Sequence, residues 1–306
     1  MTRLFRPAPT FMDVPAASSA RGSRAVVIGM PFDCGTHPVR IGSRQGPAAI
    51  REQSALLRAY DPATSRNPLA ALNVVDLGDA LVTPSLVEAS FAGIEAAVWH
   101  AVDAGAVPVT MGGDGAVTLP QLRALHRKFP DLCVVHIDAH TDAYPIDGYN
   151  TATTFSRAVE EGALDPGRSF HIGARGPTMV PGVFEHARAL GYTLVTMDRL
   201  MEDGERAVFD RVRERIGGRP VYLCFDMDFF DPAAAPGVCT PTWGGASARE
   251  GLSILRRCED LNLVACDINT VSPPHDVGGM TAFLAATVLW NCLAMLANRE
   301  HRPNIR

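Results

Sequence analysis

The chain has 306 residues, of which 47% are hydrophobic and 20% are charged. This balance is typical of a soluble globular protein and excludes collagen-like, coiled-coil and disordered chains. The 28 basic and 33 acidic side chains leave a formal net charge of -5, so no strong attraction to nucleic acid or to an anionic membrane is expected. Seven cysteines without a CxxC pair indicate a reduced, cytoplasmic protein rather than a disulfide scaffold.

Short apolar runs alternate with longer helix-like segments along the chain. Near-continuous apolar strands separated by helices indicate a mostly parallel sheet covered by helices on both faces. With no flexible linker and no internal repeat, residues 1–306 are interpreted as a single α/β domain. The predicted strands are 25–29, 72–76, 107–111, 132–138, 169–173, 193–197, 221–226 and 263–268, and the predicted crossover helices are 85–104, 119–129, 182–190, 205–216 and 248–261.

The segment 280–297 is the closest approach to a membrane-spanning sequence. Thr281, Thr287 and Asn291 interrupt its apolar run, and the N-terminus has no uninterrupted apolar region typical of a signal peptide. We therefore expect a buried helix that closes the fold, and neither a membrane span nor a membrane partner.

Acidic residues collect just after two of the predicted strands. Asp138 ends the strand 132–138 and is followed by His140 and Asp142, and Asp226 ends the strand 221–226 and is followed by Asp228. Residues two apart on extended backbone point the same way, and ligands of open parallel sheets bind beyond the carboxyl ends of the strands. The five side chains are therefore expected to converge. Without a cation the carboxylates would repel one another, and two divalent ions would neutralise the four aspartates.

Oxygen-rich ligation with an imidazole favours Mn²⁺, with Ni²⁺, Fe²⁺ and Zn²⁺ left open. Two adjacent ions can share a hydroxide and make it a nucleophile near neutral pH. The alternative is that each aspartate independently caps a helix or turn after its strand. The combination of DxHxD and DxD after buried strands of one sheet favours the metal site.

These motifs resemble those of the ureohydrolase family, which includes arginase, agmatinase, guanidinobutyrase and proclavaminate amidinohydrolase. The resemblance is closest to the agmatinase branch and covers nearly the whole chain. The segments that carry it are VVIGMPFDCGT (26–36), RIGSRQGPAAIRE (40–52), MGGD (111–114), DAHTD (138–142), DMDFFDP (226–232), APG (235–237), VSP (271–273) and GMTA (279–282).

The resemblance implies an arginase-like fold with an eight-stranded, mostly parallel sheet and a trimeric or hexameric assembly. It also implies a dinuclear Mn²⁺ site whose bridging hydroxide attacks a guanidinium carbon, which releases urea and an amine. Carried over to this chain, Asp138 and Asp226 would bridge the two ions. His140 and Asp228 would complete one ion, and Asp142 would serve the other.

Three positions depart from the family pattern. Gly115 ends a GGDG segment where the family has GGDH, so the first ion lacks an imidazole ligand. Thr151 stands where related enzymes have a proton-relaying histidine, and its hydroxyl does not titrate near neutral pH. Thr270 stands where the family has a glutamate that pairs with the substrate guanidinium, and it cannot supply that charge-assisted pair.

No catalytic residue beyond the metal ligands is assigned from the sequence. Among the histidines that could replace the missing ones, His37 and His275 are the better candidates, and we place His275 with Thr151 and Thr270 near the substrate. His136 lies on the same side of its strand as Asp138 but deeper. Arg175 is interpreted as a structural arginine that holds an acidic loop.

Two functions are carried forward. The first is a degenerate, non-catalytic accessory subunit of a heteromeric, metal-dependent hydrolase that releases urea from a guanidine or a biguanide such as metformin. Such a chain would resemble the degenerate subunit of metformin hydrolase, would pair with an intact ureohydrolase paralogue, and would hold Mn or Ni partially or not at all. The alternative is an active agmatinase-like amidinohydrolase with altered specificity, which cleaves a small guanidino compound to urea and an amine. A binding or sensing protein and a standalone pseudoenzyme complete the alternatives.

Overall fold

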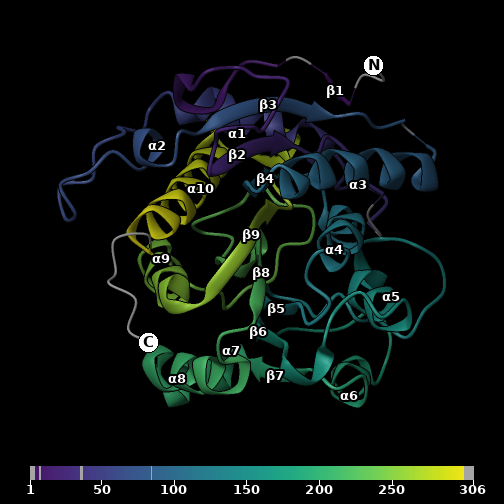
Figure 1. Ribbon diagram of the computed structural model, residues 1–306. Coiled ribbons are helices and arrows are strands. Elements are labelled where there is room, and N and C mark those ends of the chain that lie inside the picture. Colours follow the sequence, from purple (N-terminus) through teal and green to yellow (C-terminus); the bar gives the residue numbers. More distant parts are fainter. Residues whose placement is uncertain (1–3, 7, 35–36, 84, 300–306) are drawn as a thin grey trace.

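A central twisted sheet runs through the protein (Figure 1). The computed structural model describes residues 4–6, 8–34, 37–83 and 85–299. Within these residues the sheet has nine strands in the order β1-β3-β2-β4-β9-β8-β5-β6-β7, and only β1 pairs antiparallel. The strands are β1 (Phe5–Arg6), β2 (Ala25–Gly29), β3 (Val75–Ala80), β4 (Val107–Met111), β5 (Cys133–Ile137), β6 (Phe170–Ala174), β7 (Thr193–Thr196), β8 (Pro220–Asp226) and β9 (Asn262–Asn269).

The mostly parallel α/β sheet is confirmed, and two details of the strand prediction are wrong. The ninth strand, β1, has only two residues, which is too short to give a periodic pattern. The strand expected at 72–76 begins at Val75 because a short helix, α2 (Pro68–Ala71), occupies the preceding chain. The Asn67 side chain accepts hydrogen bonds from the Leu69 and Ala70 amides and caps that helix, and Leu72 ends it.

Helices cover both faces of the sheet (Figure 1). Successive strand residues point to opposite faces, so Val134 packs in the core beneath α3, α4 and α5, and Val135 packs in the core beneath α8, α9 and α10. The helices are α1 (Gly46–Ser54), α3 (Val87–Asp103), α4 (Thr118–His126), α5 (Thr154–Glu160), α6 (Val183–Ala189), α7 (Met197–Asp203), α8 (Glu205–Ile216), α9 (Ala248–Arg256) and α10 (Met280–Arg299).

Helix α10 is a core helix, as predicted. Its length and its mean hydropathy of 1.8 would suffice to cross a membrane, but 61% of its most apolar window is buried inside the protein. It packs against α1 and β9, and its Cys292 and Leu289 are fully buried. Most of the apolar surface of α10 is therefore buried inside the fold.

The sheet topology brings the acidic strand ends together. Strands β5 and β8 are neighbours near the centre of the sheet, with Val135 opposite Leu223 and His136 opposite Cys224. Asp138 directly follows β5 and Asp226 ends β8, so both carboxylates reach the same edge of the sheet. The register of the two strands thus places the DxHxD and DxD segments side by side.

Candidate metal centre

A cavity of about 550 Å³ lies beyond the carboxyl ends of the central strands. Its wall contains seven of the eight side chains predicted from the sequence to be metal ligands or to lie near substrate. They are Asp138, His140, Asp142, Thr151, Asp226, Asp228 and Thr270. The four aspartates are almost fully buried, so the cavity has an acidic floor shielded from bulk water.

Two groups of candidate ligand atoms share Asp138, and a third group, His136, Cys224 and Asp226, overlaps one of them. In one group Asp138, His140 and Asp228 have donor atoms within 4.8 Å of one another. There His140 Nδ1 lies 3.4 Å from Asp138 Oδ1 and 3.6 Å from Asp228 Oδ2. In the other group Asp138, Asp142, Asp226 and His136 meet the same 4.8 Å limit. This division has the form expected for two adjacent ions with Asp138 between them.

The backbone after β5 is bent to present these side chains. The His140 amide donates to Asp138 Oδ1 at 3.0 Å, which turns the chain back toward the strand end. Asp142 adopts a left-handed conformation with φ of +45°. Its carbonyl accepts a hydrogen bond from the Phe155 amide at 2.8 Å, which holds this uncommon backbone in place. Such conformations persist where the surroundings over-determine them, and they are common at functional sites.

Burial and mutual repulsion dominate the electrostatics of the metal-free carboxylates. Burial raises the pKa of Asp142 well above its usual range, and the charges of Asp138 and Asp226 raise it further. Burial and the Asp138 charge raise the pKa of Asp226 to about 6. Burial would also raise the pKa of Asp138, but hydrogen bonds with Asp228 and His136 hold it well below its usual range. The cluster is therefore expensive to ionise without a bound cation.

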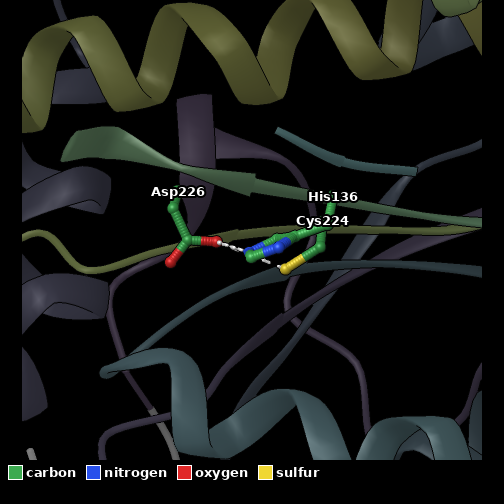
Figure 2. A group of neighbouring side chains, drawn as sticks. All are labelled: His136, Cys224 and Asp226. Atoms are coloured by element: carbon green, nitrogen blue, oxygen red, sulfur yellow. Dashed lines mark hydrogen bonds and ion pairs between the residues drawn. The ribbon is translucent and has the colours of Figure 1, made fainter. Parts of the chain in front are cut away.

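His136 lies closer to the carboxylates than its position in the strand suggested. Its Nε2 is 3.1 Å from Asp138 Oδ2 and 3.2 Å from Asp226 Oδ2. Burial disfavours its charged form, but these two hydrogen bonds raise the pKa of His136 to about 10 in the metal-free protein. Figure 2 shows that the His136 ring and the Cys224 thiol both lie beside the Asp226 carboxylate. Cys224 Sγ donates to Asp226 Oδ2 at 3.4 Å.

The residues fit divalent metal ions. The Oδ1 atoms of Asp226 and Asp228 are buried and have no hydrogen-bond partner among the described residues. An unpaired buried carboxylate oxygen is costly, and a metal ion would satisfy it. Carboxylates combined with imidazole suit Mn²⁺ and the other first-row divalent ions considered above.

Comparison with known proteins agrees with this geometry. The model of the arginase family matches residues 23–295. The chain belongs to the arginase family. Its relatives include the guanidinopropionase of Pseudomonas aeruginosa, 39% identical over 298 residues that cover 96% of this chain and 93% of the relative. The guanidinobutyrase of the same organism is 41% identical over 276 residues, covering 89% and 86%. The solved structure of proclavaminate amidinohydrolase from Streptomyces clavuligerus has a TM-score of 0.90 and 36% identity, covering 97% and 99%.

In this arginase-family protein, the Asp142 carboxylate takes up the space beside Gly115. A Cβ atom added at Gly115 would stand 2.6 Å from Asp142 Oδ2 and 3.1 Å from Thr151 Cγ2. Gly115 itself supplies no ligand atom, and a larger side chain there would displace Asp142. An imidazole ligand of the group that contains Asp142 therefore cannot come from residue 115.

The Thr270 hydroxyl bonds the backbone with its one proton and with one of its two lone pairs. Its Oγ1 accepts from the Met227 amide at 3.0 Å and donates to the Asn269 carbonyl at 2.7 Å. Its backbone has φ of +69°, which is rare for a β-branched residue, and its amide donates to Gly113 at 2.8 Å. The hydroxyl stabilises this strained turn.

The two other candidate histidines, His275 and His37, lie in different places relative to the cavity. His275 is not among the residues that line the cavity, since it lies in a turn where its Nδ1 pairs with Ser272 Oγ at 2.9 Å. Its place near the substrate stays a prediction. His37 does line the cavity, and its Nδ1 accepts from the Val39 and Arg40 amides at 3.3 and 3.1 Å.

Arg175 holds the site through backbone carbonyls rather than carboxylates. Its Nη2 donates to the Asp228 and Thr242 carbonyls, each at 2.8 Å. Thr242 Oγ1 in turn lies 3.2 Å from His140 Nε2. The predicted structural role is consistent with these contacts, which link the loop at 240–243 to the end of β8.

Proposed function

We propose that this arginase-family protein is a metal-dependent hydrolase that cleaves a guanidino compound to urea and an amine. The observation that carries the proposal is the pair of ligand groups sharing Asp138 on the floor of the cavity. The names of its relatives support the same class, because guanidinopropionase and guanidinobutyrase act on guanidino compounds.

Asp138, His140, Asp142, Asp226 and Asp228 would hold the metal, for which we propose Mn²⁺ or Ni²⁺. Divalent ions bound there supply Lewis acidity, which activates water for attack on an electrophilic carbon. The protein's own part is to fix the ligands, through the bent backbone at Asp142 and the Arg175 contacts, and to keep the floor buried. Ligands held in advance avoid reorganisation during the reaction.

The cavity favours a cationic substrate with an apolar portion. Its acidic floor attracts a guanidinium group. Because Thr270 is neutral, residue 270 offers no charge-assisted pair to guanidinium nitrogen atoms, and its hydroxyl already bonds the Met227 amide and the Asn269 carbonyl. Around the mouth, Met179 and Trp243 are 58% and 74% exposed and line the cavity, which suits an alkyl substituent. A less polar or N-alkylated guanidine, including a biguanide such as metformin, is the substrate class we propose.

A second candidate function is favoured by Gly115 and Thr151. In this reading the chain is an accessory subunit that packs with an intact ureohydrolase paralogue in a trimer or hexamer and holds metal weakly or not at all. The close approach of Asp142 to Gly115 supports it, because no imidazole at position 115 could bind without moving that carboxylate.

Elemental analysis and urea release from the purified chain distinguish the two candidates. The chain is loaded with Mn²⁺ or Ni²⁺ and offered 3-guanidinopropionate, 4-guanidinobutyrate, agmatine, N,N-dimethylguanidine and metformin. Two ions per chain with urea from one of these compounds support the hydrolase. An inactive chain with one ion or none, whose co-expression with an intact paralogue yields activity, supports the accessory subunit. Asp138→Asn is the control, since it removes a ligand from both groups.

We also propose that the protein acts in the cytoplasm. All seven cysteines are free thiols, and six of them are buried. Free buried cysteines are typical of a reducing compartment.

A further inference from the structure

The second ligand group contains an imidazole that the sequence pattern did not assign to it. We propose that His136 is a metal ligand and supplies, from inside β5, the imidazole that Gly115 cannot supply. The inference rests on the proposed function in one respect, because it requires a metal ion at this site. Its ligand set is His136, Asp138, Asp142 and Asp226.

The distances from His136 Nε2 to two carboxylate oxygens match those between neighbouring donors of a single ion. His136 Nε2 is 3.1 Å from Asp138 Oδ2 and 3.2 Å from Asp226 Oδ2, and an Asp142 oxygen lies within 4.8 Å of all three. Neighbouring donors of an octahedral ion with bonds of about 2.1 Å are about 3.0 Å apart. His136 is thus already within a few tenths of an ångström of the spacing required.

The other ring nitrogen of His136 has the partner expected of a metal-bound histidine. Its Nδ1 lies 2.8 Å from Nδ1 of His171, on the neighbouring strand β6. Metal ligands of this type donate their second N–H to a fixed acceptor, which sets the tautomer and the ring orientation. When His136 donates here, its Nε2 lone pair faces Asp138 and Asp226. The Phe155 ring, with a centroid 4.4 Å away, packs against the imidazole and fixes it.

An electropositive group must lie between His136 Nε2 and the two carboxylates. A bare Nε2 lone pair facing two carboxylate oxygens would be repulsive, so the space holds either a proton on Nε2 or a metal ion. Asp226 Oδ1 is buried and unpartnered among the described residues, which favours a cation with more than one open coordination position. Cys224 instead donates its S–H to Asp226 Oδ2 and orients that carboxylate (Figure 2).

Pulsed electron paramagnetic resonance of bound Mn²⁺ tests the assignment without any activity measurement. The His140→Gln variant removes the imidazole of the other group, so His136 is the one remaining candidate imidazole ligand among the described residues of the two groups. Loaded with less than one Mn²⁺ per chain, this variant should show echo modulation from a directly bound nitrogen. Labelling with ¹⁵N-histidine should change the modulation to that of ¹⁵N. Mn²⁺ bound without histidine nitrogen coupling would overturn the inference and leave the proposed hydrolase standing.

Metal affinity provides the second test and its control. His136→Gln should weaken binding of one of two Mn²⁺ ions about 10- to 100-fold, while Cys224→Ser, which keeps a hydrogen-bond donor near Asp226, should leave both affinities within about 2-fold. Equal loss in both variants would show that disturbing Asp226, rather than removing a ligand, is responsible, and would overturn the inference. A wild-type chain that binds no metal at all would overturn the inference and the proposed hydrolase together.

Discussion

The Asp142 carboxylate lies against Gly115, with its Oδ2 2.6 Å from the point where a Cβ on residue 115 would stand. Real Cβ atoms do not approach oxygen this closely, so the acidic cluster and the glycine are packed as a unit. The absence of a side chain at 115 therefore has two consequences. It removes a potential metal ligand at residue 115, and it leaves room for the Asp142 carboxylate.

Even the smallest side chain at position 115 should disturb Asp142. Gly115→Ala is expected to lower the free energy of unfolding of the metal-free protein by roughly 1–3 kcal/mol, the usual cost of overpacking a buried site. Gly218→Ala is the matched control, because nothing lies within 4 Å of its Cβ position. Urea unfolding in the presence of a chelator gives both values. If the two variants are equally stable, the Asp142 carboxylate moves aside without cost.

The Thr270 hydroxyl should stabilise the backbone turn at residue 270. Thr270→Val keeps the shape but leaves the buried Met227 amide and Asn269 carbonyl without this partner, so we expect a loss of about 1–3 kcal/mol in the free energy of unfolding. Thr270→Ser keeps the hydroxyl and should lose less than half as much. Chemical unfolding of both variants checks the order. A Ser variant as unstable as the Val variant would mean that the methyl group, not the hydroxyl, stabilises the turn.

The sequence predicted the acidic cluster well because the evidence for it is local. The spacing of two within DxHxD and DxD defines which side chains share a face, and apolar runs of four and five residues define the strands that carry them. Both rules hold for Asp138, His140, Asp226 and Asp228 in the structure.

The features that the sequence did not predict depend on contacts between distant segments. His136 was placed deeper than Asp138, and only the pairing of β5 with β8 shows that it also reaches Asp226. Its spacing of two from Asp138 was the available signal. Sequence also cannot show that Thr270 has a positive φ and a hydroxyl committed to the backbone. The start of β3 was misplaced because the cap at Asn67 outweighs the apolar run that follows it.

The metal-free protein should lose stability as the pH rises. Burial raises the pKa of Asp114 from its ordinary 3.8 to about 7, so between these values the folded state binds a proton that the unfolded state has released. Stability then falls as pH increases through this window, by an amount on the order of a few kcal/mol. Asp114→Asn should reduce the difference in unfolding free energy between pH 5 and pH 8.

The comparison requires chelated protein and one control. Asp131→Asn, at an exposed position, should leave the difference between pH 5 and pH 8 unchanged. Asp142 contributes a slope of the same sign, and the charge of Asp114 is one of the causes that raise its pKa, so Asp114→Asn reduces both contributions. An Asp114→Asn protein with the wild-type pH dependence would show that Asp114 is already ionised at pH 5 in the folded state.

Metal binding should stabilise the fold through the shared ligand. At 100 times the dissociation constant, a bound ion adds about 2.7 kcal/mol per site. Adding Mn²⁺ to chelated wild-type protein should therefore raise Tm by several degrees, and Asp138→Asn should abolish the rise because Asp138 belongs to both groups. The exposed Asp210→Asn is the control and should respond as wild type. A full response in Asp138→Asn would place the stabilising ion elsewhere on the protein.

Arg175 should act on metal affinity without touching a metal. Its guanidinium spans the Asp228 and Thr242 carbonyls, and Thr242 in turn contacts His140, so both non-shared ligands of that group depend on it. A lysine has one compact ammonium and cannot keep the same fork of hydrogen bonds. Arg175→Lys is expected to weaken one of the two Mn²⁺ affinities about 10- to 100-fold.

Arg123→Lys is the control. It alters a bidentate pair with Glu161 and should leave both Mn²⁺ affinities unchanged. Calorimetric titration separates the two sites. Equal weakening of both would indicate a general loosening of the cavity, because among the described residues the hydrogen bonds of the Arg175 side chain go to backbone carbonyls and not to the side chains of the Asp142 group.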